Sequence, residues 1–85
     1  MTAKLADSIA LVTGAANGIG RATALRLAKD GARLAILDLE AGPLADVAEE
    51  VRAAGGEVLD IEADCTADEP VEEAIMRIRE RFALL

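Results

Sequence analysis

The sequence contains no histidine, tyrosine or tryptophan, and its only serine is Ser8. Its only lysines are Lys4 and Lys29. Mechanisms in which a tyrosine, a tyrosine–lysine pair or a histidine moves a proton therefore have no residues to use within these 85 positions. We predict no catalytic residue in the chain.

Cysteine and long apolar runs are also scarce. The single cysteine, Cys65, cannot form a disulfide within the chain. No apolar run approaches the ~18 residues that span a bilayer, and residues 1–7 lack the apolar core of a signal peptide. We therefore expect a reducing, cytoplasmic setting and no membrane partner.

Basic charge is in deficit, with 9 lysines and arginines against 16 aspartates and glutamates and a net charge of −7. An acidic chain without a basic cluster is a poor ligand for nucleic acid, so we expect none as a partner. Acidic neighbours such as Glu49 and Glu50 fit solvated helix faces. Without histidine or convergent spacing, we predict no metal site.

The composition that remains is that of a globular chain, since 53% of the residues are hydrophobic and 29% are charged. A length of 85 residues suffices for one small domain of marginal stability. No linker or internal repeat divides the chain, so residues 1–85 are predicted to belong to a single domain.

Hydrophobic periodicity alternates between strand-like runs and helix-like stripes. Strands are predicted over residues 9–12, 33–37 and 58–63, the first buried on both faces and the third, which alternates with acidic residues, nearer a sheet edge. The first helix is predicted over residues 18–30. The second is predicted to begin at Gly42 and Pro43 and to end at Gly55. The third is predicted to follow a capping box at residues 66–69. The apolar stripes of the last two helices are Leu44, Val47, Ala48, Val51 and Val71, Ala74, Ile75, Ile78, Phe82. The order βαβαβα predicts an α/β fold with a parallel sheet.

A glycine-rich turn, residues 13–20, directly follows the first predicted strand and opens the first helix. Such a turn lets the backbone approach a phosphate, and the helix start supplies N–H groups. Gly14 and Gly18 are separated by three residues and no lysine follows, which excludes a Walker loop. Strict G-x-G-x-x-G spacing also fails, because Thr23 stands where the third glycine is required. A methyltransferase is not matched either, since Val12 and Thr13 precede the glycines in place of an acidic residue.

The pattern T-G-x-x-x-G-I-G resembles the cofactor loop of the short-chain dehydrogenase/reductase family. The resemblance covers the whole chain but only the N-terminal, cofactor-binding half of the family's domain. It implies a partial Rossmann-type sheet with flanking helices and a dinucleotide as ligand. The loop residues that it implies in cofactor binding are Gly14, Asn17, Gly18, Ile19 and Gly20.

Two acidic positions complete the resemblance. Asp38 ends the second strand, where the family binds the adenosine ribose, and a carboxylate there favours NAD over NADP. Asn17 and Leu39 occupy places where NADP-binding members carry basic residues. Asp64 and Cys65 resemble the Asp-Val pair that binds adenine through a carboxylate and a backbone N–H. Cys65 itself is interpreted as a small packing residue and not a nucleophile.

The family's Asn-Asn-Ala-Gly segment and its catalytic serine, tyrosine and lysine are absent from these residues. The chain is therefore interpreted as the NAD(P)-binding half of a short-chain oxidoreductase that is not catalytic alone. A non-catalytic nucleotide-binding or regulatory module and a ligand-free truncated remnant stay open as alternatives. Residues 9–12 are expected to form an open strand edge, which favours self-association or pairing with a C-terminal half.

Overall fold

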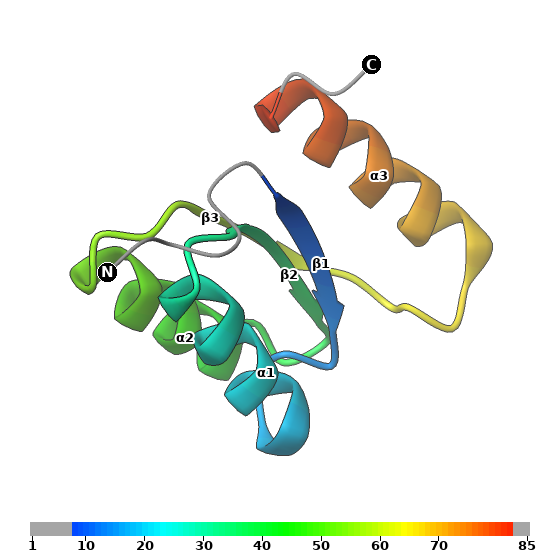
Figure 1. Ribbon diagram of the computed structural model, residues 1–85. Coiled ribbons are helices and arrows are strands. Elements are labelled where there is room, and N and C mark those ends of the chain that lie inside the picture. The colour runs from blue at the N-terminus through cyan, green and yellow to red at the C-terminus, as the bar shows by residue number, and fades with distance from the viewer. Residues whose placement is uncertain (1–7, 83–85) are drawn as a thin grey trace.

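The computed structural model describes residues 8–82, in which three strands alternate with three helices (Figure 1). This order confirms the predicted α/β class. The elements are β1 (Ile9–Thr13), α1 (Gly18–Lys29), β2 (Arg33–Asp38), α2 (Ala41–Ala53), β3 (Val58–Glu62) and α3 (Asp68–Phe82).

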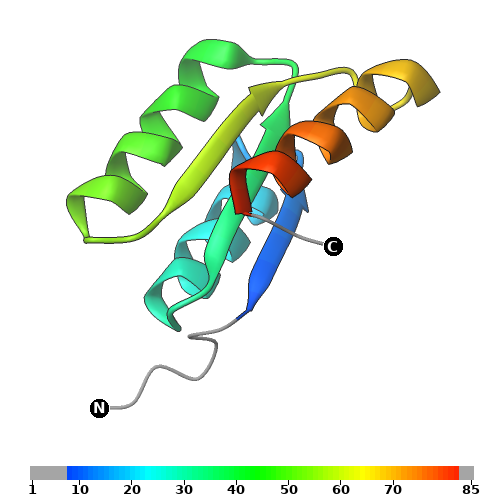
Figure 2. The ribbon, with the colours of Figure 1, turned by 90° about the horizontal axis from the view of Figure 1, so that it is seen from above.

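The strands form one parallel sheet in the order β1-β2-β3 (Figure 2). Register pairs Ile9 with Arg33 across β1 and β2, and Leu34 with Val58 across β2 and β3. The central strand β2 is the most deeply buried, as its continuous apolar run requires. Because the three strands are parallel, their C-terminal ends lie side by side, and the loops that follow them lie together there.

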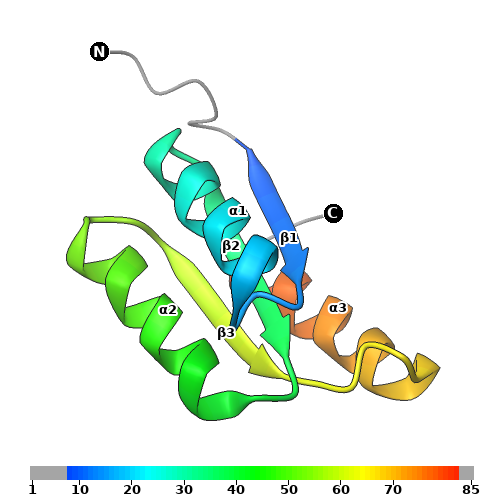
Figure 3. The same cartoon turned by 90° about the horizontal axis from the view of Figure 1, so that it is seen from below.

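Helices cover both faces of the sheet. Figures 1 and 3 show α1 and α2 on one face and α3 on the other. The first face is packed by a cluster that includes Leu34, Ile36 and the predicted stripe of α2, all nearly inaccessible to solvent. The second is packed by Leu37 and Ile61 against the buried side of α3. The alternation of β2 and β3 side chains between these two clusters is what period-two geometry requires.

Helix α2 begins earlier than predicted. It starts at Ala41, so that Pro43 occupies the third helical position and not the first. The first bond within the helix is donated by the Leu44 N–H to the Glu40 carbonyl, at 3.0 Å. A proline is tolerated in this turn because the N–H groups of the first three helical residues have no acceptor in the helix.

The predicted capping box of α3 is wrong. The Thr66 hydroxyl and N–H both donate to Asp64 Oδ1, at 2.6 and 2.9 Å, and the helix begins only at Asp68. Thr66 is therefore occupied by the preceding turn and not by the helix. The predicted stripe is also narrower than expected, because Ile75 is 43% exposed.

β1 and β3 are the outer strands of the sheet among the described residues. β3 lies at an edge, as its alternating pattern predicts. β1 also has a neighbour on one side only within the described residues, and Leu11 is 51% exposed, so the prediction of burial on both faces is wrong. A strand covered on both faces and a strand covered on one face can carry the same short apolar run, so the run alone does not predict how many faces are buried.

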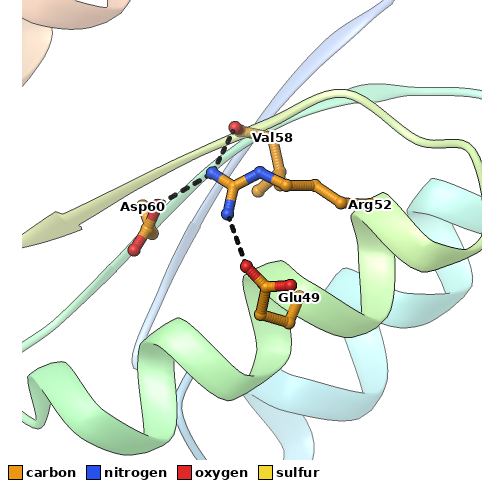
Figure 4. Close-up of polar contacts among 4 residues, drawn as sticks. All are labelled: Glu49, Arg52, Val58 and Asp60. Atoms are coloured by element: carbon orange, nitrogen blue, oxygen red, sulfur yellow. Dashed lines mark hydrogen bonds and ion pairs between the residues drawn. The ribbon is translucent and has the colours of Figure 1, made fainter.

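Arg52 of α2 makes polar contacts with the outer edge of β3 (Figure 4). The carbonyl of Glu57 faces β2, where it accepts the Leu34 N–H at 2.9 Å, so the next carbonyl, that of Val58, faces outward. Arg52 Nη2 donates to this carbonyl at 3.3 Å and to Asp60 Oδ1 at 3.2 Å. Its Nη1 lies 3.5 Å from Glu49 Oε1. Arg52 thus occupies an acceptor that another strand would need.

Candidate functional site

The loop between β1 and α1 depends on glycine at two positions for its backbone path. Gly14 and Gly18 have φ values of 63° and 55°, in the left-handed region that other residues adopt at a cost. A Cβ built at either position would meet nothing within 4 Å among the described atoms. The backbone of the loop therefore borders open space at both glycines.

Gly20 is required for a different reason. Its backbone is ordinary helix, but a Cβ there would lie against the Gly14 carbonyl group, 2.7 Å from its carbon. The first turn of α1 thus packs directly on the loop, with no room for a side chain. This contact fixes where the start of α1 stands relative to Gly14.

The start of α1 presents backbone donors that have no acceptor within the helix. The first bond within the helix runs from the Arg21 N–H to the Asn17 carbonyl, at 3.2 Å, so the N–H groups of Gly18, Ile19 and Gly20 have no acceptor in the helix. Asn17, in an extended conformation, makes no side-chain cap to them. Ile19 beside them is 86% exposed. Exposed donors at the positive end of a helix favour an anion.

Asp38 joins the end of β2 to this loop. Its Oδ2 accepts the Ala16 N–H at 3.1 Å, and its Oδ1 accepts the Glu40 N–H at 3.1 Å. These bonds, that from Glu40 first, hold the pKa of the Asp38 carboxyl below its ordinary value. The carboxylate is thus fixed in place and charged.

Glu40 is a site residue that sequence reasoning missed. The Asn17 side-chain amide donates to Glu40 Oε2, a second link between the glycine loop and the residues that follow β2. The signal available in the sequence is an acidic residue two places after Asp38, which is ambiguous because acidic residues are common before helices.

Asp64 and Cys65 follow β3. Hydrogen bonds from the Thr66 side chain and backbone lower the pKa of Asp64. Cys65 is exposed, so its predicted role in packing is wrong. Partial burial of its thiol and the charges of Asp38 and Asp64 raise the pKa of Cys65, which disfavours a thiolate.

One cavity of about 170 Å³ brings four of the predicted residues together. It lies between the ends of the three strands. The remaining predicted residues, Asn17, Gly18, Ile19 and Gly20, lie outside it at the start of α1. The cavity is lined by Gly14, Asp38, Leu39, Ala63, Asp64, Cys65 and Thr66.

Basic and metal-binding groups contribute little around this cavity. Arg21, the arginine next to the glycine loop, pairs with Glu50 of α2 at 2.5 Å. Among residues 8–82, no group of three or more histidine, cysteine or acidic side chains is placed to hold a metal ion. None of the helices in this range combines the length and hydrophobicity needed to cross a membrane.

Comparison with known proteins identifies the family of this arrangement. A family model described as short chain dehydrogenase matches residues 8–85. The 2,5-dichloro-2,5-cyclohexadiene-1,4-diol dehydrogenase LinX of Sphingobium indicum is 42% identical over 82 residues, which cover 96% of this chain and 33% of that protein. The chain thus spans about a third of the length of this relative.

Solved structures agree. A short chain dehydrogenase/reductase from Burkholderia phymatum, in complex with NAD, matches with a TM-score of 0.90 at 32% identity, over 94% of this chain and 28% of that one. A metagenomic short-chain oxidoreductase in complex with NADP matches with a TM-score of 0.87 at 30% identity, over 94% and 36%. These matches confirm the predicted partial Rossmann-type fold.

Proposed function

The chain belongs to the short-chain dehydrogenase family, and on this premise we propose that residues 1–85 are the N-terminal part of one dinucleotide-binding domain. Its ligand is a nicotinamide dinucleotide, which both structural relatives named above carry. The observation that supports this most strongly is the open backbone at Gly14 and Gly18 beside the uncapped start of α1.

The residues present fit the pyrophosphate of such a ligand. Side chains at Gly14 or Gly18 would fill the space that their backbone borders, and glycine leaves it free. The N–H groups of Gly18, Ile19 and Gly20 and the dipole of α1 favour negative charge there. Asn17 takes a structural part in this proposal, because its amide links the loop to Glu40.

Asp38 fits the ribose of the adenosine. Each of its oxygens accepts one backbone N–H, and a carboxylate has about four acceptor sites, so acceptors remain for ribose hydroxyls. Its negative charge disfavours a 2′-phosphate, and Leu39, exposed beside the cavity, supplies no positive charge. The proposed cofactor is therefore NAD in preference to NADP.

Asp64 and Cys65 fit the adenine. They line the same cavity as Asp38, so a base attached to that ribose reaches them within one nucleoside. The Asp64 carboxylate is an acceptor for the amino group of adenine, and the backbone N–H of Cys65 is a donor for a ring nitrogen. The Cys65 thiol has no part in this proposal.

When bound, the cofactor supplies hydride transfer, and this chain binds and orients its adenosine end. Tyrosine is absent from the sequence, so we propose that the chain alone does not turn over an alcohol or carbonyl substrate. Its proposed partner is a strand that pairs with the outer edge of β1, from a C-terminal half or from a second copy. Sedimentation of the chain at several concentrations, with and without a C-terminal half, tests this pairing.

The test of cofactor binding is a calorimetric titration of NAD into the parent chain, Gly18→Ala and Gly55→Ala. Gly55 is a matched control, since it also has a positive φ, of 89°, and open space at its Cβ, but it lies in the turn after α2. Both substitutions impose similar backbone strain, about 1–2 kcal/mol. We expect Gly18→Ala to weaken NAD binding at least tenfold and Gly55→Ala to leave it within about twofold. Equal affinities for NAD in all three chains would overturn the proposal.

A further inference from the structure

Glu40 brings a second negative charge to the rim of the candidate site. We propose that Glu40 is a specificity-determining residue, whose carboxylate disfavours a phosphate on the adenosine ribose and so adds to the selection of NAD over NADP by Asp38. The inference rests on the proposed function, because it assigns Glu40 to the same site.

The Glu40 N–H donates to Asp38 Oδ1 at 3.1 Å, on the carboxylate that is proposed to bind the ribose hydroxyls. A 2′-phosphate is attached to one of those hydroxyl oxygens, so its own oxygens must lie among the groups that flank Asp38. Those groups are the glycine loop on one side and the turn through Leu39 and Glu40 on the other.

The exposed Glu40 side chain is held by the Asn17 amide of the glycine loop. Its carboxylate is therefore kept at Asn17 of the glycine loop, and the preceding residue, Ala16, donates its N–H to the ribose-binding carboxylate. An amide donor is neutral, so Asn17 fixes the position of the charge without cancelling it.

None of the ion pairs found among residues 8–82 includes Asp38 or Glu40. Arg21, which follows the glycine loop, is paired with Glu50. Two carboxylates without a paired cation face a group that carries about −1.5 to −2 charges at neutral pH. The net interaction with a 2′-phosphate is repulsive.

The substitution Glu40→Gln isolates the charge, because glutamine keeps a carbonyl oxygen that accepts the Asn17 amide. The parent chain and the variant are titrated with NAD and NADP by calorimetry, or by amide NMR shifts where binding is weak. We expect the ratio of the NADP and NAD dissociation constants to fall about three- to eightfold at low ionic strength, and less at high salt, because the added charge acts partly through water.

The matched control is Glu80→Gln, which removes the same charge from an exposed position near the end of α3. That end of α3 lies near the N-terminal ends of the strands, away from the candidate site, since the adjacent Arg81 pairs with Glu57, which directly precedes β3. The control should leave the ratio unchanged. If the parent binds NAD but Glu40→Gln leaves the ratio unchanged, or Glu80→Gln lowers it equally, this inference alone is overturned. If the parent binds neither dinucleotide, the proposed function fails and the inference with it. The salt dependence of the parent's ratio gives a second readout and should weaken in Glu40→Gln.

Discussion

Single residues of the candidate site were predictable where a residue type has one backbone or steric reason to be there. Gly14 and Gly18 need positive φ, and Gly20 lies against the Gly14 carbonyl group, so their spacing carries the loop geometry in the sequence itself. The role of Glu40 could not be predicted, because its contact with Asn17 depends on where two loops meet. Side-chain hydrogen bonds across 23 positions, such as that from Asn17 to Glu40, leave no periodic signal.

The pH dependence of stability is a prediction at this scale. The pKa of Asp38 in the folded chain is below the ordinary value of 3.8, which we take for the unfolded chain. Folding therefore stabilises the charged form of this side chain. That stabilisation is present above the unfolded pKa and is lost as the pH falls through the folded pKa. Asp38→Asn should therefore be less stable than the parent near neutral pH, with the gap closing below about pH 3.8. Urea unfolding of both chains between neutral and acid pH measures the gap, and a gap that is constant over this range would contradict the prediction.

Elements were predicted well in order and poorly at their ends. The i, i+3, i+4, i+7 stripe from Leu44 to Val51 located α2, because a buried helix face repeats over several turns. The predicted starts of α2 and α3 are wrong for two local reasons. Proline is tolerated at any position of a first helical turn, so Pro43 does not mark the first residue of α2. The Thr66 hydroxyl bonds to Asp64 instead of capping α3. The exposure of Leu11 depends on which element covers that face of β1, and the five residues of the strand do not encode this.

The covered edge of β3 gives a prediction at the scale of elements. Arg52→Ala removes the donor on the outward carbonyl of Val58 and should permit edge-to-edge association through β3. Arg79→Ala, an exposed change in the last turn of α3, is the control with the same loss of charge. Sedimentation velocity should show more concentration-dependent association for Arg52→Ala than for Arg79→Ala. Identical behaviour of the two variants would show that Arg52 does not protect this edge.

At the scale of the whole molecule, the site exists because parallel strands end together. Residues that are distant in sequence, Gly14, Asp38 and Asp64, follow three successive strands and therefore line one cavity. The outer edge of β1 and the half-exposed Leu11 stand at the side of the sheet away from β3. The relatives named above are about three times as long as this chain, so the chain is compared with only part of each.

The most direct test of the central claim is to map NAD binding on the whole chain by amide NMR. If the chain binds NAD as proposed, adding it should shift the amides of residues 14–20, Asp38 and its neighbours, and Asp64 and Cys65. The amides around Gly31 and Gly55, which precede β2 and β3 at the N-terminal ends of the strands, should stay unchanged. No shifts at saturating NAD, or shifts centred on the N-terminal ends of the strands, would contradict the assignment of this site.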